Sequence, residues 1–177
     1  RHTRSTLKYL IRLFLFGIIS EVPFDLALHA KYVDWKYQNV YWTLFLGLLA
    51  ITGLRFAKER IENKVLQTIV RILSVGITAS AAWFFKTDYH AVGVLTIVIM
   101  DLYIENYTYS MTFGCAMLML SNQIEISAFA AVPLVSRYNG QRGLKSKYFF
   151  YAFYPLHFAV LAVICHLMGL IDLTRWH

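Results

Sequence analysis

Long runs of apolar residues, separated by short polar gaps, follow one another along almost the whole chain. A transmembrane helix needs about 20 mainly apolar residues, and some of these runs are shorter than that. The pattern predicts seven helical segments, at about 7–28, 39–55, 65–85, 90–104, 107–121, 123–136 and 148–171. The region 105–136 fits either one long bent span or two short ones.

The composition excludes a soluble domain. Hydrophobic residues make up 58% of the 177 residues and charged residues only 15%, against about 25% charged residues in an ordinary soluble domain. A compact domain of this size could not bury so much apolar surface. The sequence therefore predicts an all-α protein, a polytopic transmembrane helix bundle with about seven membrane segments, forming a single integral membrane domain over 1–177. Because the first residue is Arg1 and not Met, this domain is compatible with the C-terminal portion of a longer chain.

The net charge of +7 comes from basic residues that fall in three clusters between the apolar runs. The clusters consist of Arg1, Arg4, Lys8 and Arg12, then Arg55, Lys58, Arg60 and Lys64, then Arg137, Arg142, Lys145 and Lys147. If 105–136 forms two spans, all three clusters lie on one side of the membrane, which by the positive-inside rule is the cytoplasm. The segment 172–177 is then outside. No zinc-ligand spacing or nucleic-acid signature is present, so neither a metal nor a nucleic acid is expected.

Two carboxylates interrupt the first apolar run. Glu21 and Asp25 are four residues apart and would share one face of a helix, with Pro23 between them. An ionisable group within the hydrocarbon is costly and usually faces the bundle interior, so the pair can serve as a base or as an orienting pair for a reacting group. The alternative, a helix end that emerges into water with both carboxylates solvated, is about equally well supported.

His157 lies in the apolar run YFFYAFYPLHFAVL, two residues after Pro155. An imidazole in that position can abstract a proton near neutral pH. The alternative, favoured for an isolated histidine, is an interface side chain that bonds a backbone carbonyl exposed by Pro155. Tyr154 can donate a hydrogen bond in either case.

The remaining polar positions within the runs favour structural interpretations. Arg71 lies inside the third segment and is expected to pair with Glu21, Asp25 or Asp101 within the bundle. Asp101 and Glu105 share a helical face near a membrane boundary and are expected to be solvated. Gln123 and Glu125 are expected to flank a turn, and Cys115 and Cys165 to be small core residues.

The segment RYNGQRG, 137–143, is compact and contains two glycines. Gly140 and Gly143 permit a tight turn with exposed backbone amides, and basic side chains surround it. Amides combined with arginines suit a phosphate group. On composition alone, a basic loop that anchors the chain on the cytoplasmic side is the better interpretation.

Three stretches together resemble the TraX family. They are LIRLFLFGIISEVPFDLAL at 10–28, NVYWTLFLGLLAI at 39–51 and RYNGQRGLKSKYFFYAFYPLHF at 137–158, and their order and spacing agree with that family. The resemblance implies a multi-pass bacterial inner-membrane acetyltransferase that uses acetyl-CoA, with the N-terminal amine of pilin as the prototype acceptor. Family members usually carry further N-terminal hydrophobic segments, including an Asp-His-Ile-Gly-like stretch, that are absent here, and Gln141 stands where the family tends to have Lys.

Acyl transfer is therefore the first hypothesis. His157, or a histidine upstream of Arg1, would deprotonate the acceptor, Glu21 or Asp25 would orient that base, and Arg12 or Tyr154 would stabilise the oxyanion. The acceptor would be a pilin-like protein N-terminus or a small amine or hydroxyl compound. The phosphates of acetyl-CoA would bind at Arg137, Asn139, Gly140, Arg142, Gly143, Lys145 and Lys147. No metal is expected, and membrane lipid would surround the helices.

A small transporter or channel is the second hypothesis. Buried Glu21, Asp25, Arg71 and His157 would then form a polar pathway. The sequence lacks the paired inverted halves of many transporters, so this hypothesis ranks below acyl transfer.

Overall fold

The computed structural model describes residues 6–139 and 147–171, and this part of the chain is almost entirely helical. Its only β-type pairing is an isolated bridge between Gln38 and Thr87. The elements in chain order are α1 (Thr6–His29), α2 (Val40–Arg60), α3 (Lys64–Phe84), α4 (His90–Leu102), α5 (Tyr107–Met119), the 3-10 helix η1 (Gln123–Ala131), α6 (Val132–Ser136) and α7 (Lys147–Leu167). The predicted all-α fold is confirmed.

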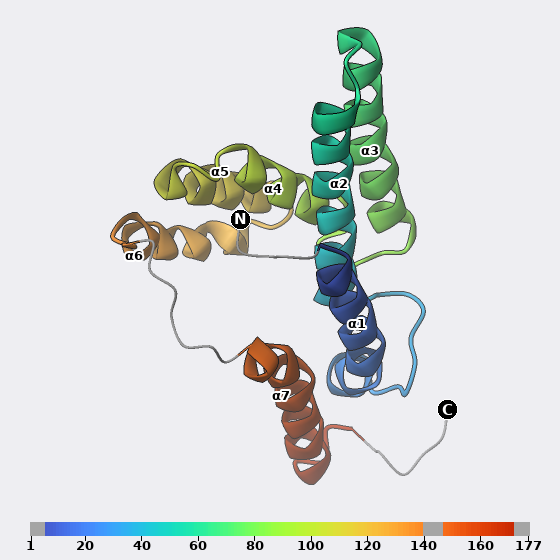
Figure 1. Cartoon of the computed structure of the whole chain (residues 1–177). Coiled ribbons are helices and arrows are strands. Elements are labelled where there is room, and N and C mark those ends of the chain that lie inside the picture. Colours follow the sequence, from blue (N-terminus) through green and yellow to red (C-terminus); the bar gives the residue numbers. More distant parts are fainter. Residues whose placement is uncertain (1–5, 140–146, 172–177) are drawn as a thin grey trace.

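The helices form three neighbouring groups. In the first, α2 and α3 lie side by side as an antiparallel pair (Figure 1), and α4 packs against both. In the second, α5 packs on α4, and η1 and α6 pack on α5 and on each other. In the third, α1 and α7 run parallel, since Tyr9 meets Tyr151 near their starts and Phe24 meets Phe158 farther along. In Figure 1 the α4–α6 group extends crosswise to α2 and α3, so the helices do not form a simple bundle with parallel axes.

Three helices are long and apolar enough to cross a membrane among the residues that the structure describes. These are α2, α3 and the part of α7 at Phe149–Leu167. Each of α4 and α5 has 13 residues, which at 1.5 Å per residue gives about 20 Å, short of the roughly 30 Å hydrocarbon core. The region 105–136 forms two segments, because α5 ends at Met119 and both η1 and α6 fold back against it.

Two buried clusters hold the helices together. Ala50, Ala82, Val94 and Val98 form one between α2, α3 and α4. Close approach there depends on small residues, since a Cβ added at Gly47 would lie 2.5 Å from Ile97 Cδ1. The second cluster, Leu13, Tyr41 and Tyr151, joins α1, α2 and α7.

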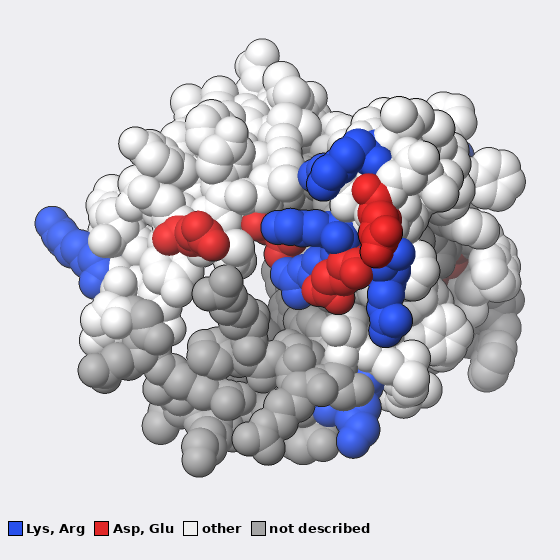
Figure 2. Space-filling model, turned by 45° about the horizontal axis from the view of Figure 1, so that its top comes forward, with Lys and Arg blue, Asp and Glu red and all other residues white. Residues whose placement is uncertain are grey.

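Charged side chains gather at the adjoining ends of α2 and α3, where acidic groups lie among the basic ones (Figure 2). There Arg55 Nη2 lies 2.6 Å from Asp101 Oδ1. The prediction for Arg71 is therefore wrong, because it has no ion pair with Glu21, Asp25 or Asp101 but is exposed on α3. Asp101 forms an exposed ion pair with Arg55.

Candidate functional site

Asn39 organises a polar junction between α1 and the start of α2. It is fully buried and is the N-cap of α2, where its side-chain oxygen accepts a hydrogen bond from the Tyr41 amide at 3.0 Å. Its Nδ2 group donates to the Gly17 carbonyl at 2.8 Å and to Glu21 Oε2. One side chain thus satisfies an otherwise unpaired amide of the first turn and fixes the α1 carboxylate beside the helix start.

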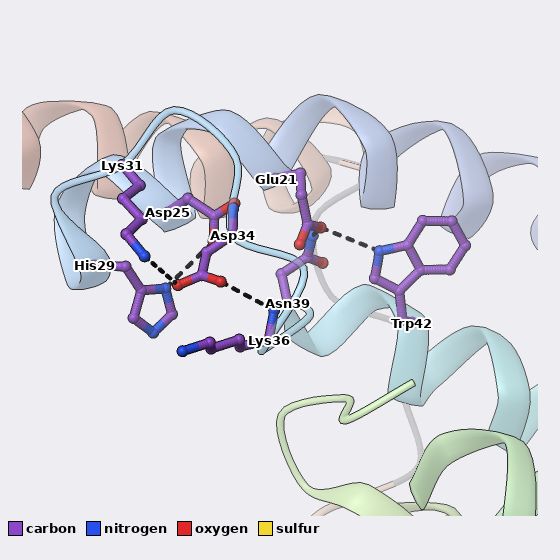
Figure 3. A network of polar contacts seen from close by, with 8 residues as sticks. All are labelled: Glu21, Asp25, His29, Lys31, Asp34, Lys36, Asn39 and Trp42. Atoms are coloured by element: carbon purple, nitrogen blue, oxygen red, sulfur yellow. Dashed lines mark hydrogen bonds and ion pairs between the residues drawn. The ribbon is translucent and has the colours of Figure 1, made fainter. Parts of the chain in front are cut away.

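Glu21 is held at this junction by two donors from α2. Trp42 Nε1 donates to Glu21 Oε2 at 3.1 Å, and Asn39 donates to the same oxygen (Figure 3). The helix N-terminus carries partial positive charge, which stabilises a carboxylate there. The second oxygen, Oε1, is buried and has no hydrogen-bond partner within the described residues. Glu21 therefore retains one acceptor oxygen that no described protein group uses.

Asp25 has a different task from Glu21. Its side chain is 0% exposed, and it accepts a hydrogen bond from the Asp34 amide at 2.6 Å and lies 3.3 Å from His29 Nδ1 (Figure 3). These contacts hold the loop after α1 against the helix end. The alternative of a merely solvated carboxylate is wrong for Asp25. Its described contacts are to Asp34 and His29, and none of them is to His157.

Tyr154 brings α7 to the same junction. Its hydroxyl oxygen accepts a hydrogen bond from the Val40 amide, the first of α2, at 3.4 Å. Its ring packs on Tyr41 and on His157, with centroids 5.0 and 5.4 Å away. Val40 follows Asn39, which donates a hydrogen bond to Glu21. Tyr154 therefore lies between the histidine of α7 and the residue that holds the carboxylate of α1.

His157 is aligned by its own helix. Its Nδ1 atom lies 3.1 Å from the Phe153 carbonyl oxygen, and its ring is stacked on the Phe153 ring. If Nδ1 carries the donated proton, Nε2 carries a lone pair and is available as a proton acceptor.

The alternative prediction for His157 is confirmed in that the imidazole bonds a backbone carbonyl, but this carbonyl is that of Phe153 and not the one that Pro155 exposes. A proline at 155 removes the amide that would bond the carbonyl of residue 151. That carbonyl accepts a hydrogen bond from the Tyr41 hydroxyl at 2.9 Å. Pro155 thus creates a cross-helix contact between α2 and α7 and not a partner for His157.

Arg12 lies in a different place from the other candidates. It interacts with the Tyr151 side chain, close to Tyr9. Arg12 precedes Glu21 by nine residues, which corresponds to about 13 Å along α1. The structure therefore places Arg12 more than two helical turns from the Glu21 junction.

The predicted phosphate-binding segment is described only in part. Arg137 and Asn139 follow α6 and are exposed. Gly140, Arg142, Gly143 and Lys145 lie outside the described residues. Lys147 begins α7, and its side chain is not described.

Two further acidic residues, Asp88 and Glu125, lie in a region that no sequence pattern indicated. The Tyr89 hydroxyl donates to Glu125 Oε1 at 3.3 Å, which joins the loop before α4 to η1. Partial removal from water, and next the Glu125 charge, raise the pKa of Asp88, whereas His90 lowers it. Asp88 follows Thr87, which forms a β-bridge with Gln38, the residue before Asn39. Only the position of these residues at the ends of successive helices could have indicated that they meet.

The apolar helices, with a polar junction built where α1, α2 and α7 meet, define a helical membrane protein. The model of the TraX protein family matches residues 1–165, and the chain belongs to this family. The resemblance drawn from the three sequence stretches is thereby confirmed. The chain is also 27% identical over 185 residues to a probable fimbrial assembly protein FimC, serogroup H1, of Dichelobacter nodosus, covering 90% of this chain and 72% of that protein. No solved structure matches the chain significantly.

Proposed function

We propose that this protein is a membrane acyltransferase that transfers an acetyl group from acetyl-CoA to an amine or hydroxyl acceptor. The observation that carries the proposal is the position of Tyr154, which packs on His157 and contacts the first amide of α2, directly after Asn39, the partner of Glu21. A base, a hydroxyl donor and a carboxylate around one point are the groups that acyl transfer needs.

In this proposal, Nε2 of His157 removes a proton from the acceptor nitrogen or oxygen. The acceptor then attacks the thioester carbonyl, and the C–S bond breaks so that CoA leaves as a thiolate. The proton held by His157 passes to that sulfur. The Tyr154 hydroxyl already accepts the Val40 amide, so its own proton is free to donate to the oxyanion.

Glu21 would orient an amine acceptor. Its buried Oε1 atom has no described donor, and an acceptor ammonium or amine would supply one. This role differs from the predicted orientation of His157, for which no contact between Glu21 and the imidazole is described.

The CoA phosphates would bind the basic segment that starts at Arg137 and Asn139 and continues through Gly140, Arg142, Gly143, Lys145 and Lys147. Tyr154 follows Lys147 by seven residues, about 10 Å along α7. The pantetheine arm of CoA is longer than that, so a thioester can reach Tyr154 from a phosphate site at the start of the helix.

The relative's name supports a proposal for the acceptor class and for the membrane. Because a relative is named as a fimbrial assembly protein, we propose the N-terminus of a pilin-like subunit as the acceptor and the bacterial inner membrane as the location. The basic loops would then face the cytoplasm, where acetyl-CoA is made.

The test is transfer of labelled acetyl from acetyl-CoA to a synthetic peptide with a pilin-like N-terminus, by the purified protein in detergent. His157→Ala should lower the rate by roughly 100-fold or more, as loss of a general base does. His166→Ala is the matched control, since His166 lies on the same helix and contacts the Ile171 carbonyl. An unchanged rate in His157→Ala would remove that residue from the mechanism.

A binding measurement separates this proposal from a transporter. Acetyl-CoA should raise the melting temperature of the wild-type protein, and Arg142→Gln should reduce the increase. Absence of any CoA effect, together with substrate-dependent flux in proteoliposomes, would favour the transporter.

A further inference from the structure

An apolar groove lies outside the junction described above. It has a volume of about 460 Å³ and is formed where α2, α3 and α4 meet. Its apolar walls include Leu54, Ile72, Val75, Val98 and Leu102. Volumes of this size are typical of small-molecule sites.

Arg71 is the charged residue of this groove. It is exposed and forms no ion pair with any residue in the described part of the chain. Asp101 precedes Leu102 of the groove wall, and its carboxylate is already paired with Arg55. The guanidinium therefore lies next to apolar walls without a described counterion.

This arrangement is costly for a membrane-spanning helix. The helix α3 is long and apolar enough to cross a membrane, and its exposed side chains include Ile69, Ile72 and Ile77. An unpaired arginine on such a surface must reach a polar group or bind an anion. Arg71 follows Lys64, the first residue of α3, by seven residues, or about 10 Å, and helix side chains lean toward the N-terminus. The guanidinium can therefore reach the depth of lipid headgroups.

We propose that the groove binds one anionic phospholipid. An acyl chain lies along the apolar walls, and the Arg71 guanidinium donates hydrogen bonds to the phosphate oxygens. Charge complementarity favours this occupant, because an arginine without a counterion meets an anion whose chain also matches the apolar walls. The site does not depend on the acyltransfer proposal, since none of its residues belongs to the Glu21 junction.

Gly76 offers a way to block the groove without changing its charge. A Cβ added at Gly76 would meet no atom within 4 Å. Since Gly76 lines the groove, a large side chain there begins in open space at the groove wall. Ile77, the next residue, is 66% exposed and does not line the groove, so it is a matched position for a control.

The test measures binding of palmitoyl-oleoyl phosphatidylglycerol and of the matching phosphatidylcholine to the purified full chain, by native mass spectrometry and by thermal stabilisation. The wild-type protein should prefer phosphatidylglycerol. Arg71→Gln should weaken phosphatidylglycerol binding by about tenfold or more, to the level of phosphatidylcholine, as loss of a charge-assisted contact does. Gly76→Phe should weaken both lipids. Lys64→Gln and Ile77→Phe should leave both affinities unchanged.

Several results would overturn the proposal. Equal wild-type affinity for the two lipids would remove the headgroup contact, and so would an unchanged preference in Arg71→Gln. Equal stabilisation by inorganic phosphate alone would assign Arg71 to a free anion. If the wild-type protein is a dimer in detergent and Gly76→Phe makes it monomeric without any lipid effect, the groove belongs to a second copy of the chain. If Arg71→Gln does not fold, Arg71→Lys should keep the preference for phosphatidylglycerol, and its loss there would also contradict the proposal.

Discussion

The hydroxyl of Tyr41 on α2 donates a hydrogen bond, 2.9 Å long, to the Tyr151 carbonyl on α7. That carbonyl is the one that Pro155 leaves without an amide donor in its own helix. The two tyrosine rings are also stacked, with centroids 6.4 Å apart. A backbone carbonyl that lacks its hydrogen bond within one helix thus accepts a hydrogen bond from a side chain of another helix.

Tyr41→Phe should therefore destabilise the protein by about 1–3 kcal/mol, because it leaves a buried carbonyl unpaired. Thermal unfolding in detergent measures the change. In a Pro155→Ala background the backbone amide restored at position 155 can bond the Tyr151 carbonyl, so Tyr41→Phe should cost clearly less there. Equal costs in the two backgrounds would show that the hydroxyl does not compensate for the proline.

Asp25→Ala should release the loop that follows α1. The Asp34 amide loses its acceptor, and we expect a loss of about 1–3 kcal/mol. Lys31 and Lys36 lie in this loop, so limited trypsin digestion should cut there faster in the variant. Asp25→Asn is the matched comparison, because its amide oxygen can still accept a hydrogen bond from the Asp34 amide, so it should release the loop less than Asp25→Ala. Similar cleavage rates in wild type and Asp25→Ala would contradict this account.

Asp88 and Asp34 should give opposite pH dependences, and both lie in loops outside the spanning helices. The pKa of Asp88 is raised above its ordinary value of 3.8, so the native state holds this proton more tightly than the unfolded state. Stability should then fall as pH rises through the raised pKa. Asp88→Asn should be more stable than wild type near pH 7, and the difference should vanish below about pH 3.8.

Asp34 is the matched comparison. The Lys36 backbone amide, and also the Lys31 charge, lower the pKa of its carboxyl. The Asp34 carboxylate contributes to the free energy of unfolding above the pKa of the unfolded state. This contribution is lost as the pH falls through the lowered pKa of the native state. Asp34→Asn should therefore be less stable than wild type near pH 7 and equal to it in strong acid. Chemical unfolding at several pH values measures the free energy of unfolding of both variants. If both variants were more stable than wild type near pH 7, or both less stable, the opposite pKa shifts of Asp88 and Asp34 would be contradicted.

Gly47→Ala should loosen the packing of α2 on α4. The added methyl group would lie 2.5 Å from Ile97 Cδ1, so the helices must shift, at a cost of about 1–3 kcal/mol. Ile97→Ala removes the clashing atoms, and Gly47→Ala should cost less in that background. Gly76→Ala, whose added methyl meets open space, should not destabilise. Unfolding of the four variants tests the interaction.

The apolar runs allowed the helices to be predicted to within a few residues, because the length of a run and its polar boundaries are local properties of the chain. The first two predicted segments, 7–28 and 39–55, correspond to α1 and α2, and Asn39 is visible as a polar cap directly before an apolar run. The crosswise direction of α4 and α5 was not predictable, because both have the composition of spans and only their length and packing distinguish them.

Part of the candidate site was predictable because it, too, depends on a local property of the sequence. Glu21, Tyr154 and His157 are notable in sequence because they are polar residues in apolar surroundings. The structure places Tyr154 against His157 and against Val40, the residue after the Glu21 partner Asn39. Tyr41 and Trp42 could not be identified, since aromatic residues are common in membrane helices. The partner of Arg71 was mispredicted because sequence does not reveal that Arg55 is already bound to Asp101.

The parallel pair α1 and α7 has a consequence for biogenesis. Among the described contacts that join α7 to α2, the partners are 110 and 114 residues apart in the chain, and the backbone of α7 packs closely on α1 alone. Translation must therefore run through nearly every other helix before Phe16 and Phe24 of α1 receive their neighbours on α7. His157 therefore acquires its surroundings only after α7 has been made and has packed on α1.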